Sequence, residues 1–164
     1  MCRFKSAIIL KDRVFITDVD SHTELLEQLK IADTRKNAEK LFVRAELYPE
    51  NNDVFSDINN WVFNVDQDIL PEWFVKEYDK QRMVEAVKKW AENHIYIDKE
   101  NIKVSGKVYL KNCKNAYAYG NSTVVIVAYS SNKKENIKLS DNATLKDCKT
   151  KTIYQSGDWK FERV

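Results

Sequence analysis

The strongest constraint on the fold of this chain is a sequence segment that occurs twice in similar form. Residues 100–119 read ENIKVSGKVYLKNCKNAYAY, and residues 135–154 read ENIKLSDNATLKDCKTKTIY. Aligned without gaps, the two segments share ten of twenty positions, where chance predicts about one or two. Self-similarity at a fixed spacing, here 35 residues, indicates stacked units that bury a continuous apolar core.

Apolar and basic residues alternate within each copy, which is typical of short strands with one buried face. The intervening segment GNSTVVIVAYSSN is also strand-like, and Val124 and Ile126 can be placed beneath Val108 and Leu110. We therefore predict a short β-solenoid of about three coils over residues 99–164. The alternative is an antiparallel meander in which each copy is a hairpin. The matched apolar pairs, expected inside, are Ile102/Ile137, Val104/Leu139, Leu110/Leu145, Cys113/Cys148 and Tyr119/Tyr154.

Residues 1–98 predict a small α+β domain, so the fold class expected for the whole chain is α+β. CRFKSAIIL and VFIT, separated by KDR, predict a hairpin. Ser21 with Glu24 forms a capping-box pattern, which predicts a helix from Ser21 to about Lys30. A short helix is expected over 34–40, with Asp33 as its cap.

The rest of this domain alternates between strand and helix patterns. FVRAEL predicts a half-buried strand with Val43, Ala45 and Leu47 on one side, and WVFNV predicts another strand. Pro71 suits the first turn of a following helix. That helix carries an apolar stripe, and three tryptophans are expected to anchor the core. The stripe is Met83, Val84, Val87, Trp90 and Ala91, and the tryptophans are Trp61, Trp73 and Trp90.

The charge is unevenly divided between the two regions. Residues 1–98 carry 14 Lys/Arg and 19 Asp/Glu, and residues 99–164 carry 13 and 6, which gives −5 and +7 and sums to the net +2. A basic half indicates either an anionic partner or mutual attraction between the halves. The three cysteines, lacking disulfide spacing, indicate reduced thiols. With no long apolar run or signal-peptide pattern, we expect a cytoplasmic protein.

Lysines recur at matched repeat positions and predict basic rows on one face of the solenoid. With nearby tyrosines these rows could follow a phosphate backbone. The alternative is a solvated surface that blocks aggregation, because lysine commonly guards exposed strands. The predicted binding residues are Lys103, Lys111, Lys114, Lys138, Lys146, Lys149, Tyr117, Tyr119 and Tyr129.

Other reactive side chains favour structural roles. Cys113 and Cys148, two coils and thus roughly 9–10 Å apart, exceed the roughly 7 Å limit of a disulfide and are expected in the core. His22, in a first helical turn, is expected to be solvated, and His94 to lie at a helix C-terminus. The DVD and DQD triplets at 18–20 and 66–68 precede helices and suit capping. No catalytic residue, metal or cofactor is predicted.

Several segments resemble a group of uncharacterised proteins from bacteriophages and gut-bacterial prophages. These segments are MCRFKSAIILKDRVFI, FVRAEL, NVDQDILPEWF, MVEAVKKW and the GNSTV unit at 120–124. Proteins of this group resemble the chain in joining a similar N-terminal domain to a tail of GNSTV-like repeats. The resemblance implies a mobile-element setting, where small non-enzymatic proteins often bind and disable a host factor.

These observations predict a non-enzymatic binding protein, directed at a host protein, a bacterial-defence factor or a nucleoprotein complex. The expected surfaces are the solenoid face or the aromatic loop 48–61. One alternative is direct nucleic-acid binding by the basic half. Another is a small hydrolase that uses Cys2, because the MCR opening resembles the Met-Cys-Gly-Arg start of SOS-response-associated peptidases, with Arg3 in place of glycine.

Overall fold

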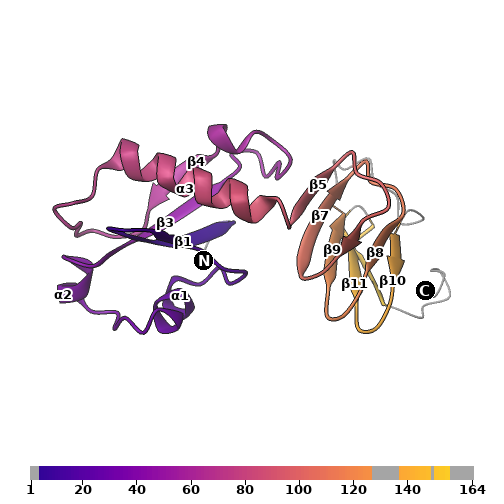
Figure 1. Ribbon diagram of the computed structural model, residues 1–164, viewed down its shortest axis with the longest axis horizontal. Coiled ribbons are helices and arrows are strands. Elements are labelled where there is room, and N and C mark those ends of the chain that lie inside the picture. The colour runs from indigo at the N-terminus through magenta and orange to yellow at the C-terminus, as the bar shows by residue number, and fades with distance from the viewer. Residues whose placement is uncertain (1–3, 127–136, 149, 156–164) are drawn as a thin grey trace. The chain divides into compact units, whose positions relative to one another are not determined.

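The computed structural model describes residues 4–126, 137–148 and 150–155. It shows a mixed α+β chain with several sheets and few helices (Figure 1). The chain divides into two compact units, residues 1–90 and 91–164.

The first unit is built on a four-stranded antiparallel sheet with the strand order β2-β1-β3-β4. Strands β1 (Lys5–Leu10) and β2 (Val14–Phe15) pair in antiparallel register, which confirms the predicted hairpin. Strand β3 (Phe42–Tyr48) lies between β1 and β4 (Val62–Val65).

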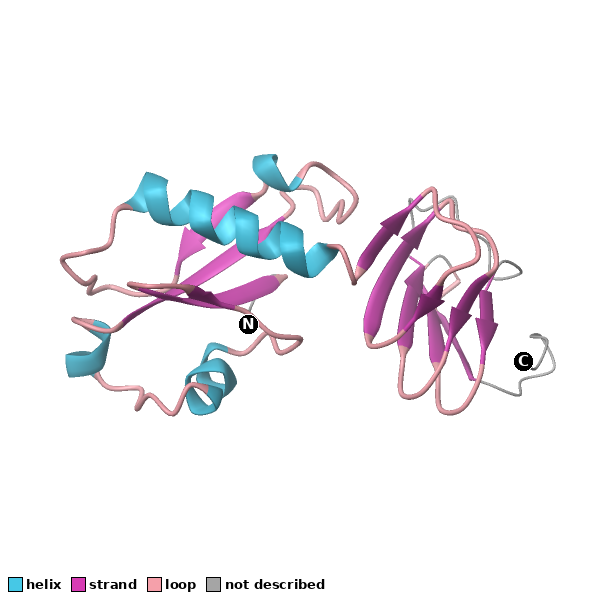
Figure 2. Ribbon diagram, in the orientation of Figure 1, coloured by secondary structure: helices cyan, strands magenta, loops and turns pink. Residues whose placement is uncertain are grey.

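Both faces of the central strands are covered, by helices from opposite sides (Figure 2). Helix α3 (Lys76–Ala91) covers one face, and helices α1 (His22–Gln28) and α2 (Arg35–Ala38) cover the other. Val43, Ala45 and Leu47 are fully buried, as the alternation of β3 predicts. The opposite face carries its own core, made of Ile8, Leu25, Leu26, Ala38 and Phe42. The strand is therefore buried on both sides, not half-buried.

The structure confirms the predicted N-cap of α1 but not the predicted starts of α2 and α3. Ser21 is the N-cap of α1, and its hydroxyl accepts a hydrogen bond from the Glu24 amide, as predicted. For α2 the cap is Thr34, not Asp33. Helix α3 begins at Lys76, and Pro71 instead lies in the turn before it, with its carbonyl accepting from the Phe74 amide. The prediction for Pro71 was wrong because the turn delays the helix by several residues.

The apolar stripe of α3 is confirmed, but the three tryptophans that were expected in the core differ in their burial. Met83, Val84 and Val87 are buried. Trp61 is only 2% exposed and packs edge-on against Phe4, with ring centroids 5.2 Å apart. Trp73 and Trp90 are half-buried, because each places its indole N–H on an oxygen near the surface, the Lys40 carbonyl and the Asp18 carboxylate respectively. Of the three predicted anchors, Trp61 alone is fully in the core.

The second unit holds two sheets made mostly of parallel strands. The larger has the order β12-β11-β9-β7-β5 and the smaller the order β10-β8-β6. Among the described strands, every pairing is parallel except that of β11 with β12. The strands are β5 (Ile95–Ile97), β6 (Lys103–Val104), β7 (Lys107–Lys111), β8 (Ala116–Ala118), β9 (Thr123–Ile126), β10 (Ile137–Leu139), β11 (Thr144–Asp147) and β12 (Thr152–Gln155).

The strand register places equivalent apolar residues side by side. Val108 pairs with Val124, as predicted, and Val124 pairs with Leu145. In the smaller sheet Val104 pairs with Ala118, and Ala118 with Leu139. These residues belong to one core that both sheets share.

The sequence repeat and the structural register agree in one sheet and differ in the other. Val104 and Leu139 lie in one ladder, at the 35-residue spacing of the repeat. In the larger sheet Leu145 lies in the ladder of Val108, not of Leu110. The predicted pairing of Leu110 with Leu145 is thus displaced by two residues, because the corner from Val104 to Val108 is two residues shorter than the equivalent corner from Leu139 to Leu145.

The corners between strands are fixed by residues in the left-handed backbone region. Asp98 and Asn112 both have positive φ, 55° and 52°, and the Asn112 amide donates to the Asp98 carboxylate at 2.6 Å. Asn101 and Asn115 repeat this arrangement, with φ of 55° and 51° and a 3.1 Å side-chain hydrogen bond. Asparagine and aspartate tolerate this region better than other non-glycine residues. Equivalent corners are therefore linked by side-chain ladders outside the apolar core.

Candidate functional site

The smaller sheet of the second unit lines up three of the predicted binding residues. Lys103 of β6 pairs with Tyr117 of β8, and Tyr117 pairs with Lys138 of β10. Both lysines are exposed, whereas their neighbours Val104 and Leu139 are buried. Together with Tyr119, which follows β8, these side chains are called the basic-aromatic face, defined as Lys103, Tyr117, Tyr119 and Lys138.

The aromatic part of this face is ordered by stacking and by a hydrogen bond. The rings of Tyr117 and Tyr119 are stacked, with centroids 6.2 Å apart and an interplanar angle of 23°. The Tyr117 hydroxyl lies 2.9 Å from the Ser140 hydroxyl, while Tyr119 is 41% exposed. Burial raises the pKa of nearby Tyr96, and the Tyr119 phenol adds to the shift. The face therefore offers stacked tyrosine rings that begin on β8, the strand between those of Lys103 and Lys138.

The strands of the basic-aromatic face carry lysine side chains and no acidic ones. Strands β6, β8 and β10 read KV, AYA and IKL, so none of them carries an acidic residue. Adjacent strands are about 4.7–4.9 Å apart, so Lys103 and Lys138 are roughly 10 Å apart along the ladder. This spacing leaves room for anionic groups beside Tyr117.

The other predicted lysines do not join this face. Lys111 and Lys146 belong to the larger sheet, where Lys111 pairs with Ile97 and Lys146 with Val125. Lys114 lies at a corner, where its ammonium is 3.5 Å from the Glu100 carboxylate. The prediction of continuous lysine rows on one face is therefore wrong, because the two sheets direct their outer residues differently. Lys149 and Tyr129 lie outside the described residues.

The described cysteines differ in their surroundings. Cys113 is 1% exposed, within the shared core, and its thiol faces the Tyr96 and Lys111 carbonyls. Burial is the main cause that raises the pKa of the Cys113 thiol. Cys148 is half-buried, so only Cys113 has the predicted interior position. Cys2, the basis of the hydrolase alternative, lies outside the described residues.

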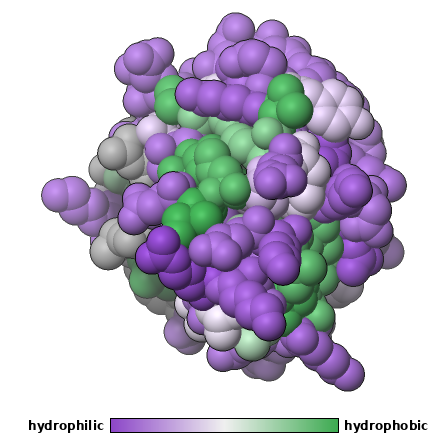
Figure 3. All heavy atoms as spheres, turned by 90° about the vertical axis from the view of Figure 1, so that its left-hand side faces the viewer, coloured by the Kyte–Doolittle hydropathy of each residue, from purple (hydrophilic) through white to green (hydrophobic). Residues whose placement is uncertain are grey.

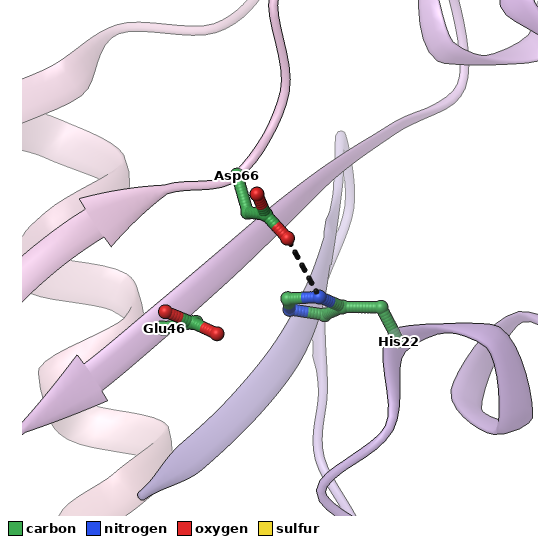
Figure 4. A group of neighbouring side chains, drawn as sticks. All are labelled: His22, Glu46 and Asp66. Atoms are coloured by element: carbon green, nitrogen blue, oxygen red, sulfur yellow. Dashed lines mark ion pairs between the residues drawn. The ribbon is translucent and has the colours of Figure 1, made fainter. Parts of the chain in front are cut away.

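A second cluster of polar residues lies in the first unit (Figure 4). His22 begins α1, Glu46 projects from β3, and Asp66 follows β4. One ligand atom from each of these residues lies within 4.8 Å of the other two. The cluster sets three potential metal ligands close together.

His22 departs from the sequence prediction, because it is buried and not solvated. Its side chain is 7% exposed, its Nε2 lies 2.9 Å from the Ala45 carbonyl oxygen, and its Nδ1 lies 3.6 Å from an Asp66 carboxylate oxygen. Glu46 is 6% exposed, and the Asn64 amide donates to it at 3.5 Å. The imidazole is buried because α1 packs this turn against β3.

No sequence motif marks this cluster, since its members are 24 and 20 residues apart. The usable signal was the alternation of β3, which places Glu46 on the same side as Arg44 and opposite Ala45. A pocket of about 500 Å³ borders the cluster, lined by residues including Ser21, His22, Arg44 and Asp66.

The two acidic triplets do not cap helices as predicted. Helix α1 is capped by Ser21, while the Asp20 carboxylate accepts from the buried Lys5 ammonium at 2.8 Å. Asp66 of the second triplet lies beside His22. The prediction failed because Asp20 pairs with Lys5 of β1 and Asp66 lies beside His22 of α1.

The surface of the first unit offers a weaker candidate. Apolar side chains form patches among hydrophilic ones on the face in Figure 3. The exposed large apolar residues of this unit are Leu41, Leu70, Val75 and Tyr78. Within the predicted aromatic loop 48–61, Val54 and Trp61 are buried, and Trp61 donates to the Ser56 hydroxyl. That loop therefore presents less aromatic surface than its sequence indicates.

Comparisons with protein-family models, with curated proteins and with solved structures found no match. Among the described residues, no helix combines the length and the apolar character needed to cross a bilayer.

Proposed function

We propose that this chain is a non-enzymatic binding protein that engages the nucleic-acid part of a nucleoprotein complex through the basic-aromatic face. The observation that carries the proposal is the ladder of Lys103, Tyr117 and Lys138, which comes from three strands far apart in sequence. Proteins that bind single strands without sequence preference combine basic grooves with aromatic rings on which bases stack. The arrangement here has both components on one side of one sheet.

The scaffold of this face is proposed to be a short β-solenoid of about three coils. In support, successive strands pair in parallel, the two sheets share one core, and equivalent corners carry side-chain ladders. A rigid stack holds outer side chains at fixed intervals, so less side-chain ordering accompanies binding.

The biological setting is proposed from the resemblance to phage and prophage proteins. In that setting the target belongs to the bacterial host, and the protein acts in the cytoplasm as an inhibitor of a host or defence complex. The +7 charge of residues 99–164 supports an anionic target.

The proposal is tested with a fluorescent 20-nucleotide oligothymidine and anisotropy titrations at several salt concentrations. For single strands, the slope of log affinity against log salt is about −0.7 per neutralised phosphate. The double variant Lys103→Glu/Lys138→Glu is expected to bind at least about tenfold more weakly and to flatten the slope by about 1.4. Tyr119→Ala is expected to weaken binding without changing the slope, because it removes stacking and not charge.

The matched control is Lys36→Glu/Lys40→Glu, which makes the same charge change on exposed lysines of the first unit. If both double variants weakened oligonucleotide binding equally, the net charge of the protein and not the basic-aromatic face would explain the binding. An oligonucleotide that fails to bind at low salt would remove nucleic acid as the target. In that case, capture of an acidic protein that depends on Lys103 and Lys138 would support the protein-binding alternative.

A further inference from the structure

We propose that His22, Glu46 and Asp66 form a binding site for one divalent transition-metal ion of the Zn²⁺ or Mn²⁺ class. The site lies in the first unit and is independent of the basic-aromatic face. The hydrogen bonding of His22 determines which ring nitrogen can bind a metal ion.

The imidazole of His22 is oriented as a metal ligand requires. A carbonyl oxygen can only accept, so Nε2 carries the hydrogen that is donated to the Ala45 carbonyl. This bond directs Nδ1 toward the carboxylates, 3.6 Å from Asp66 (Figure 4). Metal-bound histidines commonly donate their second ring N–H to a backbone carbonyl, which fixes the tautomer and the ring plane.

The carboxylates give the cluster a charge that a cation would balance. The Glu46 side chain is only 6% exposed, and the Asp66 carboxylate lies in the same cluster. Two like charges close together, one of them buried, repel each other more than they would in water. Nearby Arg44 is engaged elsewhere, because its guanidinium pairs with Asp33 and donates to Gln67.

The cluster closes around an ion when its ligand atoms approach one another by up to about 1.4 Å. Nitrogen and oxygen ligands bind Zn²⁺ at about 2.0–2.2 Å in tetrahedral sites, so neighbouring ligand atoms are roughly 3.4 Å apart. The present atoms lie within 4.8 Å of one another. Asp66 is 63% exposed and can rotate, while His22 and Glu46 are held by the packing of α1 and β3.

The donor set and the adjoining space define the type of site. Three protein ligands leave at least one coordination position for water or a further ligand, in contrast to the closed four-ligand sites that serve structure alone. The pocket of about 500 Å³ that borders His22 and Asp66 provides room for that ligand. One imidazole with two carboxylates suits Zn²⁺, which accepts nitrogen and oxygen ligands, and Mn²⁺, which favours oxygen ligands, whereas Cu⁺ would favour sulfur ligands.

The test is a titration of the full chain with Mn²⁺, followed by the loss of the free-ion EPR signal, and with Zn²⁺ by calorimetry. Mn²⁺ is used because it prefers oxygen ligands, so the thiols compete for it less than for Zn²⁺. One saturable site per chain is expected, and Zn²⁺ is expected to displace Mn²⁺. Asp66→Asn is expected to weaken binding of both ions at least about tenfold.

The matched control is Asp68→Asn, which removes an exposed carboxylate two residues away and is expected to leave binding unchanged. Glu46→Gln supplies a second variant, and the circular dichroism spectrum of each variant checks folding. Zn²⁺ is also expected to shift the His22 ring nitrogens, and not those of His94, in a long-range proton–nitrogen NMR spectrum. Absence of a saturable site, or equal affinity in wild type and Asp66→Asn, would overturn the proposal.

Discussion

Truncating Leu145 tests whether the parallel ladders of the second unit hold its core together. Leu145 is 0% exposed and pairs with Val124 on one side and Tyr154 on the other. Leu145→Ala removes three carbons, worth about 0.8 kcal/mol each in transfer free energy, and leaves a cavity. Together these terms are expected to lower the free energy of unfolding by about 2–5 kcal/mol.

The assay must report on the second unit alone, and Cys113 provides that probe. Its thiol is 1% exposed, so a thiol reagent reaches it only when this unit opens. In a Cys2→Ser/Cys148→Ser background, labelling follows the equilibrium population of the open form when closing is fast. A loss of 2 kcal/mol corresponds to roughly 30-fold faster labelling.

The control is Lys146→Ala, at the adjacent position of the same strand but exposed. Surface substitutions usually change stability by less than about 0.5 kcal/mol, so labelling should change by less than about threefold. If Leu145→Ala and Lys146→Ala labelled at similar rates, the reasoning that places Leu145 in the shared core would be wrong.

Three further predictions concern stability. The fully buried Asp79 carboxylate lies 2.6 Å from the Arg82 guanidinium, and Asp79→Asn removes this counter-charge. The variant is expected to lower the free energy of unfolding by about 3–5 kcal/mol, measured by urea unfolding followed by tryptophan fluorescence. A loss below about 1 kcal/mol would contradict this expectation. At Asn112, with φ of 52°, Asn112→Ala should be about 1–2 kcal/mol less stable than Asn112→Gly, and equal stabilities would exclude a left-handed corner. Because burial raises the pKa of Cys113 above its ordinary value of 9.0, the folded state keeps a proton that the unfolded state releases. The stability of the second unit is therefore expected to be unaffected by this thiol below pH 9 and to fall as pH rises above it; Cys113→Ser should lessen that fall, and an unchanged pH profile would argue against a buried thiol.

Local patterns in the sequence were enough to predict the elements of the first unit. The capping box at Ser21 and the stripe through Met83 and Val87 depend on neighbours within one or two turns, which the sequence displays directly. The partial exposure of Trp73 and Trp90 could not be predicted from such local patterns. Trp73 donates to the carbonyl of Lys40, a residue 33 positions away, and this contact holds the ring at the surface.

The repeat predicted which strands are neighbours, but only part of their register. Val108 was correctly placed beside Val124, because both segments alternate in the same phase. The length of each corner decides the alignment of the strands that follow it, and a corner two residues shorter in the first copy displaces Leu145 from the predicted ladder. Lys111 and Lys146 are separated from the basic-aromatic face for a different reason, because they belong to the larger sheet.

The polar cluster shows the limit of sequence reasoning for sites. His22, Glu46 and Asp66 come from a helix, a central strand and a loop, and the fold alone brings them together. First-turn histidines are usually solvated, and nothing local to His22 indicates that Ala45 would supply a carbonyl acceptor.

The most direct test of the account is the pairing of β6, β8 and β10, since the basic-aromatic face exists only if these strands are neighbours. Backbone NOEs measured by NMR on labelled protein would decide it. We expect contacts from Tyr117 to the segments of both Lys103 and Lys138, in the pattern of parallel strands. Antiparallel contacts within each repeat copy, without contacts from Tyr117 to Lys138, would contradict it.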